Sequence, residues 1–326
     1  MRPEHTQQAL TLAFQSKQPA FLWGSPGIGK SAIVRQAAAA AGLQVTDIRA
    51  VLLDPVDLRG VPTVADGRAE WATPAFLPRN GRGVLFLDEL NAAPPLVQAA
   101  CYQLVLDRGL GEYRLPDGWT VCAAGNLDTD RAVTSRMGTA LASRFLHLNL
   151  DIHLDDWSRW AFDNEIRTEI IAFLRFRPGL LHSFDPKSSE KSFPCPRTWE
   201  FTSRILSQSP ARDIEFDLIR GTVGEGAAAE FTGFLRIFRD LPNPDAILLN
   251  PDQADVPTDP ATLYALCGAL ARKASENTAD RLFSYFRRLP AEFGVMAVRD
   301  SVNHAAEVVN TRAFIEWSAD NSEILI

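Results

Sequence analysis

The sequence fits the pattern GxxxxGK[ST] at Gly24-Ser25-Pro26-Gly27-Ile28-Gly29-Lys30-Ser31. Glycines here allow the backbone to turn around a phosphate with its N–H groups facing inward. Lys30 is expected to pair with the β- and γ-phosphates, and the hydroxyl of Ser31 to bind Mg²⁺. A strand is expected at residues 20–23 and a helix at 31–41, whose positive end would face the anion. The stretch therefore predicts an ATP-binding phosphate loop.

An apolar run ending in two acids follows, Gly83-Val84-Leu85-Phe86-Leu87-Asp88-Glu89. Such a run predicts a central, buried strand. A carboxylate at its end, here Asp88, is expected to complete the Mg²⁺ shell, and Glu89 to orient or deprotonate the attacking water. Glu89 therefore favours hydrolysis of ATP over binding alone.

Two further polar residues at the ends of predicted strands are candidates for contact with the γ-phosphate: Asn126 follows one strand and Arg144 precedes another. Asn126 comes directly after a strand expected at 120–125, where an uncharged amide can hold the water and sense the γ-phosphate. Arg144 precedes a strand expected at 145–150, from where a guanidinium can reach across a subunit boundary and stabilise charge at the γ-phosphate. Arg136 and Arg131 are weaker candidates for the same role.

The order of the expected elements indicates an α/β fold with a mostly parallel, helix-covered sheet. Further elements are expected at 4–16 (helix), 45–51 (strand) and 95–108 (helix). Two hairpins are expected to project from the sheet, near 57–74 and near 112–121; in the second, residues 112–115 would pair with 119–121. After about residue 151 helices are expected at 155–164, 165–176, 197–207 and 214–239, with loops at 184–196 and 241–260 before a final helical region.

Composition narrows the class of protein. The 326 residues carry a formal net charge of -7, which argues against a dedicated nucleic-acid binder.

The sequence shows no pattern typical of a zinc site. None of the four cysteines forms a CxxC pair, so free buried thiols in a reducing cytosol are expected: Cys101, Cys122, Cys195 and Cys267. No HExxH spacing occurs, and His147 and His153 are expected to face solvent or pack rather than bind metal. The polar N-terminus and the lack of a membrane-length apolar run predict a soluble, cytoplasmic protein without a membrane partner.

Residues 11–206 together resemble the AAA+ ATPases, and within them the MoxR-like family of the helix-2-insert clade. The stretch 85–98 is similar to that family's extended Walker B segment, Asp57-Leu58-Arg59-Gly60 to its lead into the inserted hairpin, and Ala140-Leu141-Ala142-Ser143-Arg144-Phe145 to its arginine-finger segment. Phe193-Pro194-Cys195-Pro196-Arg197-Thr198-Trp199 is similar to the start of its sensor 2 helix.

The resemblance implies a role for each of these residues. Asn126 becomes sensor 1, Arg144 the finger acting in trans, and Arg197 the sensor 2 arginine that contacts the γ-phosphate from a helical lid. It implies an AAA+ P-loop domain over 1–151, an all-α lid over 152–240, and a C-terminal helical extension over 241–326 that matches nothing in the family. The chain departs from the family at Ala92, where an arginine is usual, which puts an inter-subunit contact there in doubt.

The family's function implies a ring, expected to be a hexamer, that remodels or matures client protein complexes together with a von Willebrand factor A-domain partner. Trp71 and Tyr113 in the two hairpins would grip a polypeptide, or else pack against their own sheet. Two alternatives stay open. A nucleic-acid motor of the restriction-translocase kind predicts hydrolysis stimulated by DNA, although only Arg68, Arg79 and Arg82 resemble a basic patch. A nucleotide-dependent scaffold without turnover would not need Glu89.

Overall fold

The computed structural model describes residues 1–130 and 137–321. They form two compact units, and each is described by itself. The first unit comprises Met1–His153 with Asp185–Ser188, and the second comprises Leu154–Phe184 with Ser189–Ile326. None of the helices in the described part combines the length and the apolar character that crossing a bilayer requires.

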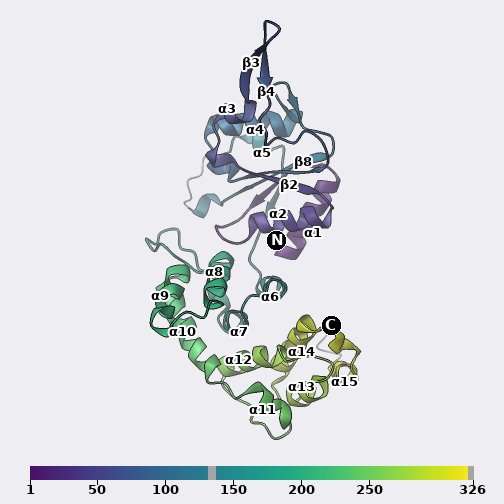
Figure 1. Ribbon diagram of the computed structural model, residues 1–326, viewed down its shortest axis with the longest axis vertical. Helices are drawn as coiled ribbons and strands as arrows, with labels where there is room; N and C mark the ends of the chain where they lie inside the picture. Colours follow the sequence, from purple (N-terminus) through teal and green to yellow (C-terminus); the bar gives the residue numbers. More distant parts are fainter. Residues whose placement is uncertain (131–136, 322–326) are drawn as a thin grey trace. The chain divides into compact units, whose positions relative to one another are not determined.

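A five-stranded parallel sheet forms the centre of the first unit (Figure 1). Its strands lie in the order β2 (Gln44–Arg49), β5 (Gly83–Asp88), β8 (Trp119–Gly125), β1 (Ala20–Trp23) and β9 (Leu146–Asn149). Every residue of β8, and β5 up to Leu87, is buried, as expected of central strands. Parallel pairing brings the carboxyl ends of β1, β5 and β8 to one edge. The glycine loop, Asp88 and Asn126 all start from that edge.

Alternating side chains divide the sheet's core into two layers. One face packs Leu22, Phe86 and Cys122 against helices α1 (Pro3–Gln15) and α2 (Lys30–Ala40). The other packs Phe21, Leu87 and further side chains against α4 (Pro95–Asp107), with α5 (Thr139–Ala142) on the same side (Figure 1). Short helices complete the unit: α3 (Pro55–Arg59), η1 (Ala50–Leu52), η2 (Leu90–Ala92) and η3 (Asp128–Asp130). The predicted α/β fold class is confirmed: a parallel sheet is flanked by helices and followed by further helices.

Of the two predicted hairpins, one has the expected pairing. β3 (Val61–Ala65) and β4 (Arg68–Ala72) are antiparallel and project from the first unit (Figure 1). The second prediction is wrong in its pairing, since Trp119–Val121 belong to β8 and pair with β5. Instead β6 (Gly109–Leu110) pairs with β7 (Tyr113–Arg114). The reason is burial: a mostly apolar strand gains more from joining the central sheet than from forming an exposed ribbon.

The second unit consists of helices. They are α6 (Leu154–Asp163), α7 (Thr168–Phe176), α8 (Pro196–Leu206), α9 (Arg212–Val223), α10 (Glu225–Arg239), α11 (Pro244–Leu249), α12 (Pro260–Ala271), α13 (Ala279–Phe286), α14 (Ala291–His304), α15 (Arg312–Asp320), η4 (Pro178–Leu180) and η5 (Ala306–Asn310). Helix α7 packs against α12, and α12 against α14. The helices after residue 241 therefore share one packed unit with those before it.

Two sequence predictions in this unit are wrong. The single helix expected over 214–239 is broken at Gly224, whose φ of 83° and ψ of 166° are outside the helical region. A Cβ at Gly224 would lie 2.9 Å from the Ser192 carbonyl oxygen, so only glycine fits this corner. The loop expected over 241–260 contains α11, which starts at Pro244 and is capped by Asn243, whose side-chain oxygen accepts from the Asp245 N–H.

Candidate active site

The glycine loop connects β1 to α2 and presents an uncapped helix end. Gly29, the residue before α2, has a φ of 97°, a left-handed conformation that glycine adopts without strain. No side chain caps the first turn of α2. Its N–H groups and the positive end of the helix dipole are therefore available to an anion.

Lys30 reaches back across this loop. Its Nζ donates to the carbonyl oxygens of Gly24 at 2.6 Å and Ser25 at 3.0 Å, and to Oδ1 of Asn126 at 2.8 Å. The ammonium group thus lies between the loop and the end of β8. Because Oδ1 of Asn126 accepts from Lys30, the NH₂ group of that amide is left as a donor.

Ser31 and Asp88 form the second pair of neighbours. The Ser31 hydroxyl donates to Oδ2 of Asp88 over 2.8 Å, which joins the start of α2 to the end of β5. A hydroxyl and a carboxylate are the oxygen ligands that Mg²⁺ prefers, and such sites use one or two protein ligands together with substrate phosphates. No group of three or more His, Cys, Asp or Glu side chains suited to a metal occurs in the described residues. The pair therefore fits an ion shared with a nucleotide.

Glu89 stands at a bend directly after β5. Its φ of 57° is left-handed, which is uncommon for a residue with a side chain and turns the chain sharply. Its N–H donates to Oδ1 of Asp88 at 3.0 Å. The carboxylate of Glu89 is exposed and, within the described residues, forms no ion pair or hydrogen bond. It is free to accept a proton from a water molecule.

A buried amide that the sequence did not single out supports Asn126. Asn91 is 2% exposed, and its Nδ2 donates to the backbone oxygen of Asn126 at 2.9 Å. It packs so closely on Gly125 that a Cβ there would collide with Oδ1 of Asn91. Asn91 therefore fixes the end of β8 against the turn that follows Asp88. Its only sequence signal is a neutral amide shortly after the acidic strand end.

Asp130 is a second missed residue. Its buried carboxylate accepts from the Ser25 hydroxyl and from the Leu127 N–H, each at 3.2 Å. These contacts link the glycine loop to the segment after Asn126. Nothing in the local sequence pattern marks Asp130, because it lies beyond the end of the strand, in the short helix η3.

Arg144 lies apart from these side chains. Its Nη1 donates to the Ser143 hydroxyl at 2.7 Å and to the Ala140 oxygen at 3.2 Å, and its Cζ lies 5.5 Å from the Tyr102 ring centroid. It precedes β9, an edge strand of the sheet. Its role in trans stays a prediction, and Arg131 and Arg136 lie outside the described residues.

Arg197 belongs to the second unit, near the start of α8. Its side chain is exposed and forms no ion pair or hydrogen bond with the residues that the structure describes. Its assignment to sensor 2 stays a prediction.

The aromatic residues of the hairpins pack against their own unit. The Tyr113 hydroxyl donates to the Pro78 oxygen at 2.7 Å, and burial raises the pKa of Tyr113 to about 12. Trp71 is half-buried, with the Arg59 guanidinium carbon 5.0 Å from its ring centroid. Of the two readings of Tyr113, the structure therefore favours packing over grip.

The four cysteines are as predicted, and the ring of His147 has two neighbours. All four cysteines are free and buried, and burial raises the pKa of Cys101 to about 12. Nδ1 of His147 accepts from Trp23 Nε1 at 2.8 Å, so the proton lies on Nε2, 2.7 Å from the Ala142 oxygen. Both ring nitrogens of His147 therefore contact neighbouring groups in the first unit.

Comparison with known proteins gives likeness at the level of the fold. No protein-family model matches the chain, and no curated protein sequence matches it. Among solved structures it is similar to NtrX from Brucella abortus, at 14% identity and a TM-score of 0.44, over 91% of this chain and 67% of that one. It is also similar to the RuvB Holliday junction branch migration motor of Thermotoga maritima, at 18% identity and a TM-score of 0.40, over 82% and 81%.

Proposed function

We propose that the chain is a Mg²⁺-dependent ATPase of the AAA+ class, of MoxR type, that forms rings and remodels client protein complexes. The observation that supports ATP chemistry is the meeting of Lys30, Ser31, Asp88 and Asn126 at one edge of the sheet. These residues come from three elements, and their side chains supply one cation, one amide and two oxygen ligands.

Each side chain has a task in this proposal. Lys30 binds the β- and γ-phosphates, exchanging its contacts with neutral loop carbonyls for contacts with negatively charged phosphate oxygens. Ser31 and Asp88 hold Mg²⁺, which, when bound, neutralises charge on the transferred phosphoryl group. Glu89 orients the attacking water and accepts its proton, and the NH₂ group of Asn126 donates to the γ-phosphate or the water.

The test of hydrolysis is a Glu89→Gln substitution. It keeps the shape of the side chain but removes the base, so turnover should fall by a factor of about 100 or more while ATP stays bound. Phosphate release and retention of labelled ATP measure the two effects. Normal turnover in this variant would refute the role of Glu89. It would not by itself support either alternative function, the nucleotide-dependent scaffold or the nucleic-acid motor.

The ring is tested by mixing two inactive variants. If Arg144 completes a neighbour's site, a mixture of Glu89→Gln and Arg144→Ala subunits regains activity wherever an intact Glu89 meets an intact Arg144. Random equal mixing makes about a quarter of the interfaces complete. Activity that stays at the level of the separate variants would show that Arg144 does not act between subunits.

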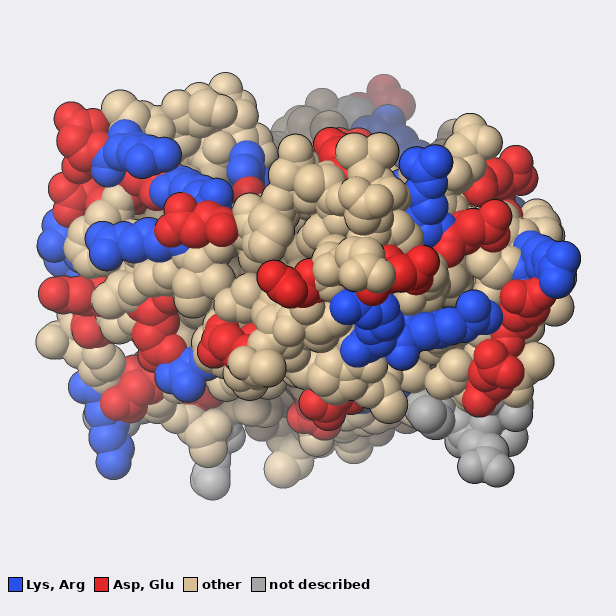
Figure 2. Space-filling view, turned by 90° about the horizontal axis from the view of Figure 1, so that it is seen from below, with Lys and Arg blue, Asp and Glu red and all other residues tan. Residues whose placement is uncertain are grey.

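Protein remodelling is tested with proteins that bind the chain. The acidic net charge of -7 favours a protein client over nucleic acid. On the face drawn in Figure 2, acidic and basic side chains are interspersed, and no extended basic field stands out. Proteins retained by the ATP-loaded Glu89→Gln variant, a von Willebrand factor A-domain protein among them, should change the ATPase rate of the unsubstituted chain. Stimulation by DNA that weakens with salt would instead support a nucleic-acid motor.

A further inference from the structure

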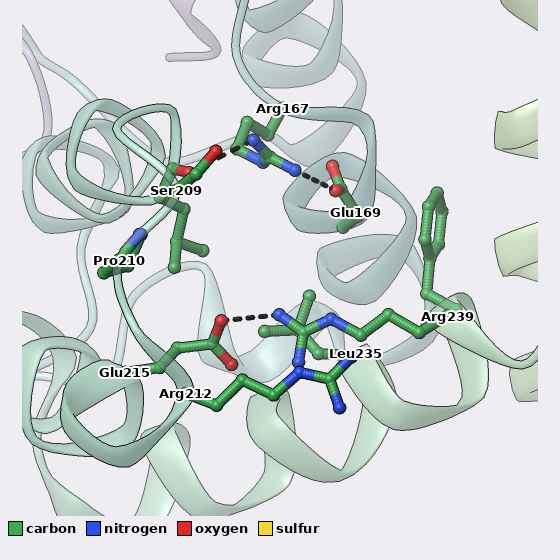
Figure 3. A pocket seen from close by; sticks show the side chains of 10 residues that line it. Arg167, Glu169, Ser209, Pro210, Arg212, Glu215, Leu235 and Arg239 are labelled. Carbon is green, nitrogen blue, oxygen red and sulfur yellow. Dashed lines mark hydrogen bonds and ion pairs between the residues drawn. The ribbon is translucent and has the colours of Figure 1, made fainter.

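A charged cavity lies within the second unit, among α7, the end of α8, α9 and α10. Its volume is about 420 Å³, within the usual size range of small-molecule sites. Three arginines and two glutamates line it: Arg167, Arg212, Arg239, Glu169 and Glu215. In Figure 3 their side chains surround one opening. None of them belongs to the proposed ATP site.

Two of the arginines are held by the glutamates. Arg167 Nη2 lies 2.5 Å from Oε1 of Glu169, and Arg239 Nη2 lies 2.5 Å from Oε2 of Glu215. Glu215 is itself only 8% exposed at its side chain, so Arg239 is oriented by a buried partner. These pairs fix the guanidinium groups and cancel two of the three positive charges.

The third arginine has no such partner. Arg212 is exposed and, in the part of the chain that the structure describes, forms no ion pair or hydrogen bond. Figure 3 shows it beside Arg239 on one side of the pocket. The lining therefore carries one uncompensated positive charge on a fork that suits carboxylate and phosphate oxygens.

Apolar side chains form the rest of the wall. Leu206 and Leu235 are buried, and Phe238 is partly exposed. All three line the cavity. A ligand with an apolar body would cover them while its anionic group meets the arginines.

We propose that this pocket binds a small organic anion, a carboxylate or phosphate carried on an apolar group. Arg212 binds the anionic group, Arg239 flanks it, and Leu206, Leu235 and Phe238 cover the apolar part. Since the wall is made of four helices, occupancy stabilises their arrangement by mass action. Helix α8 carries Arg197 at its other end, so the pocket is placed to bias the helices that would respond to nucleotide.

The test measures binding of three probes by calorimetry: benzoate, phenyl phosphate and neutral benzyl alcohol. A Lys30→Ala background removes the ammonium of the glycine loop, so phosphate binding there does not interfere. Benzoate and phenyl phosphate should bind, and benzyl alcohol should bind at least about tenfold more weakly, because it lacks the charge-assisted contact. The readout needs no ATPase activity.

Substitutions assign the site. Arg212→Ala should weaken binding of both anions about tenfold or more. Arg236→Ala is the matched control, because this exposed arginine lies on α10 but does not line the cavity. Both changed side chains are exposed, and thermal melts without ligand should match the parent. The proposal is overturned if neither anion saturates at millimolar concentration, or if Arg236→Ala weakens binding as much as Arg212→Ala.

Discussion

A buried ion pair in the second unit is expected to make a large difference to the free energy of unfolding. Arg175 on α7 and Asp300 on α14 form a two-pronged pair, with Nη2 to Oδ1 at 2.8 Å and a second contact between Nη1 and Oδ2. The side chains are 8% and 1% exposed. Replacing Asp300 by alanine leaves the guanidinium buried with the Phe162 ring, 5.5 Å away, as its remaining described partner. Removing one member of a buried pair costs about 3–5 kcal/mol.

Urea unfolding of the intact chain measures the effect. Tryptophan fluorescence reports on both units, since Trp23 and Trp119 lie in the first and Trp157, Trp199 and Trp317 lie in the second. We expect the midpoint for this unit to fall with an unchanged slope, because the exposed area on unfolding hardly changes. The double variant Arg175→Met, Asp300→Leu should lie within about 2 kcal/mol of the parent, since no unpaired charge remains.

A neighbouring residue provides the control. Arg299 on the same helix pairs with Asp155 at 3.6 Å, and both side chains are about half exposed. Arg299→Ala should therefore change stability by less than about 1 kcal/mol. A loss below about 1 kcal/mol for Asp300→Ala, or an equal loss in the double variant, would refute the argument that burial makes this pair matter.

Three further changes test other parts of the chain. Asn91→Ala removes the hydrogen bond that holds the end of β8. ATPase turnover should therefore fall about tenfold with little loss of nucleotide affinity, as measured by kcat and KM. Equal losses in turnover and in affinity would contradict this role of Asn91. Gly224→Ala forces a side chain into a left-handed corner near Ser192 and should cost about 1–3 kcal/mol in urea unfolding; an unchanged midpoint would rule out that strain. The raised pKa of Tyr113, about 12, means that the unfolded chain ionises first, so its contribution to stability is present below pH of about 10 and is lost between about 10 and 12. Alkaline melts of the parent and of Tyr113→Phe should differ in this window, and parallel curves would contradict the assignment.

The parts of the site that the sequence predicted are those with a local pattern. The glycine loop, the apolar strand ending at Asp88 and Glu89, and the amide after the next strand each need only a few adjacent residues to be recognised. Parallel strands then bring their ends together without further information. The sequence does not predict the roles of Asn91 and Asp130, because these roles depend on which strand end each side chain contacts in the folded chain.

The errors have a similar origin. Asp117-Gly118 is a strong turn signal, and it suggested a hairpin over residues that a central strand needed. Gly224 alone does not predict a break in the helix, because a glycine inside an apolar, helical pattern is usually tolerated. In both places the deciding contact, with β5 in one case and with Ser192 in the other, comes from a distant segment.

The C-terminal helices pack on the helices that precede them in the second unit. No sequence pattern connects residues after 241 to the helices before them, yet Asp300 satisfies the charge of Arg175, and Gly268 on α12 allows Thr168 to approach within 2.9 Å of a Cβ position. Removing these helices would leave an uncompensated arginine and an apolar face on α7. We therefore expect a chain that ends near residue 240 to be less stable in its second unit than the full chain. Any movement of α7 that accompanies nucleotide binding must carry α12 and α14 with it, because a close-packed interface shifts as a body rather than deforming.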